Sequence, residues 1–245
     1  MNWVFGIHSV HTMLKSSPQR ITELQVQRGR DDARLQKILN LADQHGIKVH
    51  WSTVKQLNEL VDGRHQGVVA LCKEGATHNE DYLMALVEKS GQSGFFLVLD
   101  GITDPHNLGA CLRSADGAGV QAIIVPKDNS VGLTPVVYKV ASGAAETVPL
   151  ITVTNLARTL QKLQQKGLWI IGTSGDASNT LYDVDLTGPI AIVMGSEGSG
   201  MRQLTRSHCD FLCKLPMAGE VSSLNISVAT GICLFEAVRQ RCFKS

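Results

Sequence analysis

From residue 95 onward the chain alternates short apolar runs with helix-like segments, and this alternation limits the possible folds more than any other feature. The runs predict strands at 95–99, 122–125, 147–151, 169–173, 190–194 and 211–215. Apolar strands separated by helices indicate a parallel sheet that is covered on both faces, so the predicted fold class is α/β. Ligands of such sheets bind in the loops that follow the carboxyl ends of strands.

The last predicted helix covers residues 224–241 and carries an apolar stripe with spacings of four, four and three. Such spacing places side chains on one face of a helix, so this face is predicted to lie in the core. The stripe consists of Leu224, Val228, Ile232 and Phe235.

The segment before residue 95 predicts a smaller α/β unit followed by a connection. Its predicted helices and strands lie at 6–15, 21–26, 32–44, near 49, at 53–60 and at 67–71. Apolar density then falls, although a short helix is possible at 82–88. The expected domains are a substrate-binding unit at 1–75, a linker at 76–93 and a larger domain at 94–245.

The charge of the chain is close to balanced, with 23 lysines and arginines against 22 aspartates and glutamates. A net charge of +1 is atypical of nucleic-acid-binding proteins. The distribution is uneven, however, because residues 1–75 hold ten basic and seven acidic side chains, and the remainder holds 13 and 15. No apolar run is long enough to span a bilayer and no signal-peptide pattern is visible, so a cytoplasmic protein without a membrane partner is expected.

The cysteines do not form a metal-binding pattern. No Cys-x-x-Cys pair is present, and the closest pair, Cys209 and Cys213, has only His208 beside it. No metal is therefore expected, and the thiols are predicted to be reduced and mostly buried. The six are Cys72, Cys111, Cys209, Cys213, Cys233 and Cys242.

The first loop expected to carry chemistry follows the strand at 95–99. Asn107 is predicted to cap the helix after it, because an asparagine oxygen can accept a free backbone N–H. Arg113 lies on an otherwise small, apolar helix. The guanidinium either pairs with a carboxylate such as Asp116 or Glu197, or grips a phosphate or reacting hydroxyl.

The second loop, at 194–201, is rich in glycine and also follows an apolar strand. Gly195, Gly198 and Gly200 let the backbone approach a ligand closely. Their spacing is the reverse of the dinucleotide-binding pattern. Glu197 among them would repel a pyrophosphate, so it suits a cationic or hydroxyl-bearing ligand, or a pairing role with an arginine; a solvated side chain is the plain alternative.

The third loop, at 215–227, leads into the last helix and is unusually polar. Ser222 or Ser223 is predicted to cap that helix. The series Ser223, Asn225 and Ser227 exceeds what one cap requires. Together with free backbone groups of the loop, these side chains could meet the edge of an adenine-like ring.

Taken in this order and at these distances, the three loops resemble those of the SpoU (TrmH) family of ribose methyltransferases. The matching segments are Asp-Pro-His-Asn-Leu-Gly from Asp104 with Arg113, Val-Met-Gly-Ser-Glu-Gly-Ser-Gly-Met from Val193, and Leu-Pro-Met from Leu215 with Ser-Ser-Leu-Asn-Ile-Ser from Ser222. The segments 4–10 and 65–70 resemble the small RNA-binding domain of the family, so the likeness covers the whole chain.

The resemblance implies a fold, a reaction and an assembly. The C-terminal domain would be an α/β knot, a deep trefoil. S-adenosyl-L-methionine would be the methyl donor, and the acceptor would be the ribose 2′-hydroxyl of a specific guanosine in 23S ribosomal RNA, with transfer RNA or another ribosomal site as the alternative. The protein would be a homodimer with its active site at the interface.

The resemblance also implies roles for individual residues. The catalytic positions would be Asn107, Arg113, Glu197, Ser223 and Asn225. The donor-binding positions would be Gly195, Gly198, Leu215, Met217, Leu224 and Ser227. Because a guanidinium keeps its proton at neutral pH, Arg113 is expected to stabilise the developing alkoxide or to orient a phosphate, with Glu197 and Asn107 fixing its geometry.

Two other classes of protein compete with this interpretation. A nicotinamide-dependent oxidoreductase would also use a parallel sheet, but the reversed glycine spacing disfavours it. An RNA-binding protein without catalytic activity would share the fold. The presence of all the motif residues disfavours that alternative.

Overall fold

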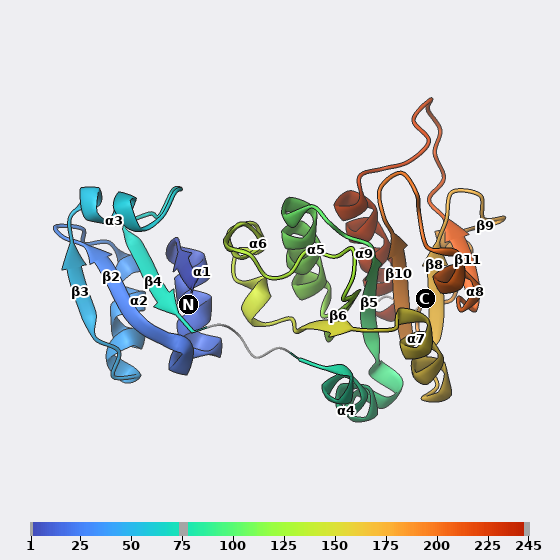
Figure 1. Ribbon diagram of the computed structural model, residues 1–245, viewed down its shortest axis with the longest axis horizontal. Coiled ribbons are helices and arrows are strands. Elements are labelled where there is room, and N and C mark those ends of the chain that lie inside the picture. The colour runs from blue at the N-terminus through green and yellow to red at the C-terminus, as the bar shows by residue number, and fades with distance from the viewer. Residues whose placement is uncertain (1, 74–77, 243–245) are drawn as a thin grey trace. The chain divides into compact units, whose positions relative to one another are not determined.

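The computed structural model describes residues 2–73 and 78–242 (Figure 1). The chain divides into two compact units. Unit 1 comprises Met1–Ala76 with Leu133–Thr147, and unit 2 comprises Thr77–Gly132 with Val148–Ser245. The domain boundaries expected from the sequence stay predictions.

Unit 1 is built on a four-stranded sheet in the order β1-β4-β2-β3. Strands β2 and β3 are parallel, and β4 runs antiparallel to both of its neighbours, β1 and β2. The elements of unit 1 in chain order are β1 (Asn2–Phe5), α1 (Ile7–Ser16), β2 (Ile21–Gln27), α2 (Ala33–Gln44), β3 (Val49–Ser52), α3 (Val54–Leu60), β4 (Val68–Cys72) and α6 (Pro135–Ala141). Strand β1 was not predicted, whereas the other elements before residue 73 lie within two residues of their predicted positions.

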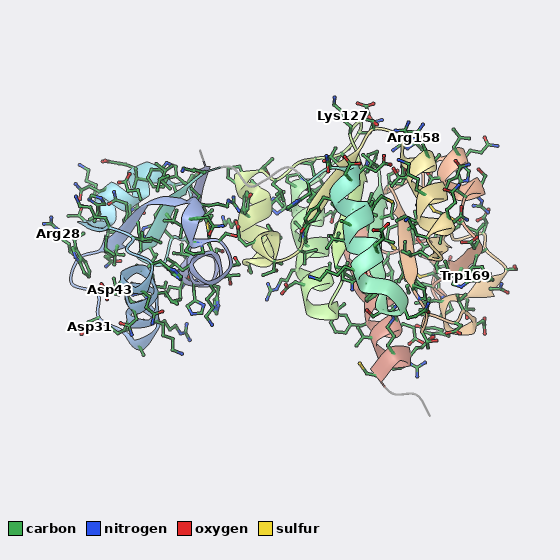
Figure 2. The ribbon with its side chains drawn as sticks, turned by 90° about the horizontal axis from the view of Figure 1, so that it is seen from below. Arg28, Asp31, Asp43, Lys127, Arg158 and Trp169 are labelled. Carbon is green, nitrogen blue, oxygen red and sulfur yellow. The ribbon has the colours of Figure 1, made fainter. Side chains whose placement is uncertain are left out.

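Helix α2 shows how the sequence of unit 1 dictates its local structure. The Asp32 carboxylate caps the helix by accepting hydrogen bonds from the backbone of Arg34 and Leu35 at 3.0 and 3.1 Å. Leu35, Ile38 and Ala42 are spaced by three and four residues and are buried in the core of the unit. The charged side chains Arg28, Asp31 and Asp43 lie at its surface (Figure 2).

Unit 2 is built on a seven-stranded sheet in the order β7-β6-β5-β10-β8-β11-β9, in which every pair of neighbours is parallel. This confirms the predicted α/β class with a parallel sheet. The elements of unit 2 are α4 (Glu80–Ser90), β5 (Phe95–Asp100), α5 (Pro105–Ala118), β6 (Ala122–Pro126), β7 (Leu150–Val153), α7 (Leu156–Gln165), β8 (Trp169–Thr173), β9 (Asn179–Thr180), β10 (Ile190–Gly195), α8 (Gln203–Ser207), β11 (Phe211–Lys214) and α9 (Ile226–Cys242).

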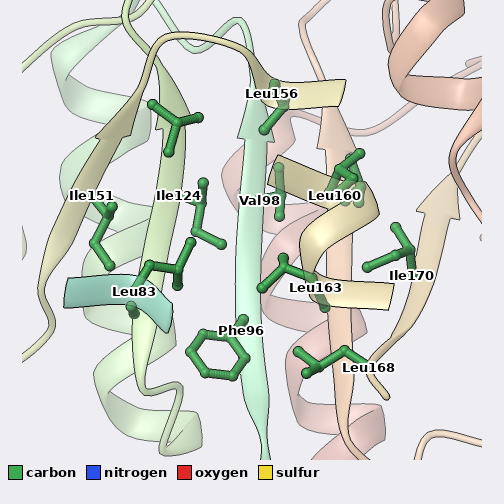
Figure 3. Packing of buried hydrophobic residues seen from close by; sticks show 14 of the residues in the cluster. Leu83, Phe96, Val98, Ile124, Ile151, Leu156, Leu160, Leu163, Leu168 and Ile170 are labelled. Carbon is green, nitrogen blue, oxygen red and sulfur yellow. The ribbon is translucent and has the colours of Figure 1, made fainter. Parts of the chain in front are cut away.

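The sheet of unit 2 is covered on both faces, as its apolar strands require. Phe96 and Val98 of β5 belong to one core cluster with Leu160 and Leu163 of α7 (Figure 3). Helix α4 adds Leu83 to the same cluster. Helices α5 and α9 pack against each other on the opposite side, behind the sheet in Figure 3. All six residues of β5 are buried, which explains why its sequence lacks alternation.

Helix α4 covers the short helix that the sequence allowed at 82–88, and its Val87 is buried in the core. Two features of unit 2 differ from the sequence-based expectations. The strand predicted at 147–151 begins only at Leu150, because residues 144–146 form a 3-10 turn. The two-residue strand β9 was not predicted. No helix in the described parts of the chain is long and apolar enough to cross a membrane.

The apolar stripe on α9 was wrongly predicted to lie in the core. Val228 and Phe235 are each 51% exposed. The buried face of α9 consists instead of Ile226, Thr230, Cys233, Leu234, Glu236 and Ala237. Periodicity identifies which residues share a face, but it does not show which face packs against α5 and the sheet.

Candidate functional site

The three loops singled out from the sequence follow strands β5, β10 and β11 at their carboxyl ends. In the sheet, β10 lies between β5 and β8, and β8 pairs with β11. Because all these strands are parallel, their carboxyl ends face the same edge of the sheet. The topology therefore brings the loop after β5, which ends at Asp100, together with the loops after β10 and β11, which end at Gly195 and Lys214.

The first loop places Asn107 inside helix α5 rather than at its start. The helix begins at Pro105, and the Asp104 carboxylate caps it by accepting from the backbone N–H of His106 at 2.8 Å. The prediction that Asn107 caps this helix was therefore wrong. Its side chain is buried and reaches Glu197 and Asn225 instead.

The glycine loop, residues 195–201, folds back on itself. Ser196 and Gly200 each donate a backbone hydrogen bond to the other's carbonyl oxygen, both at 3.0 Å. A Cβ atom on Gly195 would lie 2.2 Å from the backbone nitrogen of Met201, so only glycine fits there. This tight turn presents Glu197 at its tip.

Glu197 connects all three loops through one carboxylate oxygen. Its Oε1 accepts from Asn225 Nδ2 at 2.7 Å, and from Asn107 Nδ2 and the backbone nitrogen of Ile226 at 3.2 Å each. Asn225 Nδ2 also donates to Asn107 Oδ1 at 3.0 Å. The result is a closed network of a carboxylate and two amides, in which each amide has a fixed orientation.

Asn225, not Ser222 or Ser223, caps helix α9. Its Oδ1 accepts from the backbone nitrogen of Ser227 at 2.9 Å and from the Ser227 hydroxyl at 2.6 Å. The predicted serine cap is corrected accordingly. The side-chain amide of Asn225 thus has two roles. Its oxygen caps the start of α9, and its nitrogen donates to Glu197.

A cavity of about 550 Å³ opens beside this network. Eight of the residues predicted from the sequence line it: Gly195, Glu197, Gly198, Leu215, Met217, Ser223, Leu224 and Asn225. Asn107 and Ser227 are not part of its lining but are hydrogen-bonded to residues that are. The volume falls in the range of about 300–1,000 Å³ typical of small-ligand pockets.

Arg113 does not join the network. It lies six residues beyond Asn107 on α5, its side chain is exposed, and it is not among the hydrogen-bond partners of Glu197. Within one chain Glu197 and Asn107 therefore hold each other and Asn225 rather than the guanidinium, and the role expected for Arg113 stays a prediction.

Sequence reasoning missed one wall of the cavity. Thr173, Ser174 and Gly175, at the end of β8, line it together with Lys214. The position of this segment directly after an apolar strand could have indicated it as part of the site, although it lacks a recognisable motif. Hydrogen bonds from Arg206 and from Ser174 lower the pKa of Asp176 in the same loop to about 2.

The cysteines are free thiols, and their surroundings make most of them unreactive. Burial raises the pKa of Cys213 to about 11, and burial together with the charge of Glu197 raises that of Cys111 to about 11. Cys242 is exposed. Within residues 2–73 and 78–242, no group of three or more His, Cys, Asp or Glu side chains could hold a metal ion.

Comparisons with solved structures reveal the same fold in methyltransferases. AviRb, a SpoU methyltransferase of Streptomyces viridochromogenes crystallised with AdoMet, superposes with a TM-score of 0.81 at 22% identity, covering 98% of this chain and 90% of that one. The AdoMet-bound rRNA methyltransferase of Sinorhizobium meliloti gives a TM-score of 0.78 at 22% identity, with 99% and 88% covered.

Sequence comparisons are more specific. The 23S rRNA (guanosine-2'-O-)-methyltransferase RlmB of Shewanella oneidensis is 58% identical over 242 residues, 97% of each chain. The protein of the same name from Escherichia coli K12 is 54% identical over 239 residues, 97% of this chain and 98% of that one. The model for RNA 2'-O ribose methyltransferase substrate binding matches residues 3–77, and that for the SpoU rRNA Methylase family matches 94–235. With its three loops gathered around one cavity, this chain belongs to the SpoU rRNA methylase family.

Proposed function

We propose that this protein transfers a methyl group from S-adenosyl-L-methionine to the ribose 2′-hydroxyl of a guanosine in 23S ribosomal RNA. The single observation that carries the proposal is the convergence of the three family loops on one cavity. The relatives named for this reaction match over nearly the full length of the chain, including the unit that would bind RNA. Transfer RNA or another ribosomal site is the alternative acceptor.

The cavity fits the methyl donor in shape and charge. Leu215, Met217 and Leu224 supply apolar lining for an adenosyl group. Gly195 and Gly198 allow the backbone to approach a ligand closely, and the Glu197 carboxylate offers a negative charge near a sulfonium. When bound, the donor supplies an electrophilic methyl group. Ser227 would act indirectly, because its hydroxyl holds Asn225.

The residues assigned to catalysis would align and stabilise the acceptor. The network of Asn107, Glu197 and Asn225 fixes the amide groups beside the cavity, and Ser223 adds a hydroxyl to its lining. The acceptor oxygen becomes negative as it loses its proton, so a fixed cation nearby accelerates the reaction. Arg113 is proposed for that role, because a guanidinium stays protonated and can bind an alkoxide or a phosphate through two N–H groups.

Replacing Arg113 with lysine tests this role. The substitution keeps the charge and removes the forked geometry, so the rate of methyl transfer should fall while the affinity for the donor is retained. An unchanged rate with an unchanged pH–rate profile would contradict the bidentate role.

A homodimer and a knotted C-terminal domain are part of the proposal. The exposed apolar residues Val228 and Phe235 give α9 a face that a second copy could cover. The exposed position of Arg113, away from Glu197 of its own chain, is consistent with a site completed by the partner. A ribosomal RNA substrate supports the cytoplasm as the proposed compartment.

The substrate is tested by mapping the 2′-O-methyl groups of ribosomal RNA in a strain that lacks the gene. We expect one guanosine of 23S RNA to lose its methyl group and to regain it when the wild-type gene is restored. A full set of ribosomal methyl groups in the deletion strain would contradict the proposed substrate and would favour transfer RNA.

A further inference from the structure

Asp100, the last residue of β5, is a buried carboxylate that lies outside the lining of the cavity. Its side chain has no exposed surface, and it binds a single residue, Arg202, in two ways. Oδ2 accepts a hydrogen bond from the backbone nitrogen of Arg202 at 2.9 Å, and Oδ1 accepts one from its Nε at 2.7 Å. The guanidinium and the carboxylate also form an ion pair, with Nη2 at 2.6 Å from Oδ1. A buried carboxylate needs such partners, so Arg202 is held in both its backbone and its side chain.

Arg202 ends the glycine loop, and Asp100 lies beside the residue that begins it. Gly195 of β10 is paired with Asp100 in the register of the sheet. The chain then turns through residues 196–200 and returns directly over Gly195 to reach Arg202. Both ends of the loop are consequently fixed to the end of β5, one through the strand ladder and one through the carboxylate.

The far end of helix α8, which follows Arg202, is held independently. Arg206 donates to both carboxylate oxygens of Asp176 at 2.9 and 3.1 Å, and to the Ser174 hydroxyl at 2.6 Å. Thr205 of the same helix is buried. Loss of the Asp100–Arg202 pair would therefore free the end of the glycine loop without releasing α8 itself.

We propose that Asp100 and Arg202 are positioning residues that hold Glu197 in register with Asn107 and Asn225. The glycine loop carries Glu197 at its tip, and the hydrogen bonds of Glu197 connect the three loops. Asp100 touches neither Glu197 nor the cavity, so it acts through Arg202. The inference rests on the proposed methyl transfer, because the consequence of a displaced Glu197 is a misaligned acceptor.

The test uses Asp100→Asn in the full-length protein, because asparagine keeps the shape and removes the charge. A misplacement of about 1 Å near the reacting groups costs roughly 100-fold in rate, so a loosened loop should lower kcat by about 10- to 100-fold. Donor affinity, measured with S-adenosylhomocysteine by calorimetry, should change by less than about fivefold, because the cavity walls on β8 and β11 are untouched. Arg202→Lys, which keeps the charge, should recover part of the rate that Arg202→Gln loses.

Asp210→Asn is the matched control. The Asp210 carboxylate also accepts from a backbone N–H, that of Ile170 at 2.7 Å, and from a side chain, Gln164 Nε2 at 2.8 Å. The contact lies next to the start of β8, at the opposite end of that strand from the cavity. This variant should lower the melting temperature by less than Asp100→Asn does, because Asp210 is exposed, and it should keep kcat within about twofold of the wild-type value.

Three results would overturn the proposal: an unchanged kcat in Asp100→Asn, an equal loss of kcat in Asp210→Asn, or additive losses from Asp100→Asn and Arg202→Gln in the double variant. Amide hydrogen exchange gives a readout that does not depend on activity. The amides of Ser196 and Gly200 should exchange faster in Asp100→Asn than in Asp210→Asn, and equal exchange would also overturn it. Absence of methyl transfer by the wild-type protein would count against the proposed function, and the exchange measurement would still decide the role of Asp100.

Discussion

Substituting Gly195 with alanine should displace the glycine loop, which forms one wall of the cavity. A Cβ atom at this position would lie 2.2 Å from the backbone nitrogen of Met201 and 2.3 Å from the carbonyl carbon of Gly200. Restoring an ordinary contact requires the returning chain to retreat by about 1.2 Å. A shift of that size breaks the paired hydrogen bonds between Ser196 and Gly200, which are 3.0 Å long. It also moves Glu197, which lies between them.

The expected losses follow from that displacement. Forcing a side chain into a closely packed site costs about 1–3 kcal/mol of folding free energy. At about 2–4 °C per kcal/mol for a chain of this size, the melting temperature should fall by several degrees. The rate of methyl transfer should fall by about 100-fold, because the displacement is about 1 Å. The affinity for S-adenosylhomocysteine should fall by at least about tenfold, because the clash displaces the backbone of Gly195 and Gly200, which themselves line the cavity, whereas Asp100 and Arg202 do not.

Calorimetric titration with S-adenosylhomocysteine, together with initial rates from a labelled donor, measures both effects. Gly188→Ala is the matched control, because a Cβ there meets no atom within 4 Å. It should leave affinity and rate unchanged. Wild-type affinity and rate in Gly195→Ala would refute the reasoning, since the backbone contact at 2.2 Å leaves no other way to fit the methyl group.

Three further predictions concern the surface of the protein. Phe235→Asp should convert a dimer into a monomer in light-scattering measurements with little change in melting temperature, because the side chain is half exposed within one chain; a wild-type monomer would contradict it. The double variant Arg28→Gln, Lys55→Gln should weaken RNA binding and flatten the plot of log K against log salt by about 1–2, with donor affinity unchanged; an unaltered slope would exclude phosphate contacts by these two side chains. Asp176 should titrate near pH 2 in carbon NMR, because the bonds from Arg206 lower its pKa to about 2. Because the pKa of Asp176 is lower in the folded than in the unfolded state, its pair with Arg206 stabilises the protein above about pH 4, and this contribution is lost between pH 4 and 2. A titration midpoint of Asp176 near pH 4 would show that the pair is absent in solution.

The sequence predicted the sheet of unit 2 well because its strands are buried on both faces. A run such as 169–173 is mostly apolar and is easily recognised as a strand, and the observed strand has the same bounds. Short strands at the edge or with few residues, such as β1 and β9, leave too little pattern to detect. The loop motifs indicated which residues would meet, but not through which atoms. Asn107 illustrates this, because Asp104 caps the helix three residues before the predicted cap and so leaves the asparagine free to reach Glu197.

Helix α9 marks the limit of pattern-based reasoning. Its apolar stripe is genuine, yet Val228 and Phe235 are exposed while Thr230 and Glu236 are buried. A periodic pattern identifies a face but cannot tell whether the chain's own core or another molecule covers it. Arg113 shows the same limit. Its spacing in the sequence did not reveal that Glu197 of the same chain would bind the amides of Asn107 and Asn225 and not its guanidinium.

The structure also gives a physical reason why the glycine loop is unsuited to a nicotinamide dinucleotide. Dinucleotide sites bind the pyrophosphate with free backbone N–H groups at the start of a helix. Here the backbone N–H of Arg202, at the start of α8, already donates to the Asp100 carboxylate. The carboxylate therefore takes the position that a pyrophosphate would need. The amides of Ser196 and Gly200 are bonded within the loop. Because these three amides are engaged and the loop carries the Glu197 carboxylate, the loop would repel a pyrophosphate and attract a cation. A sulfonium-bearing methyl donor presents such a cation.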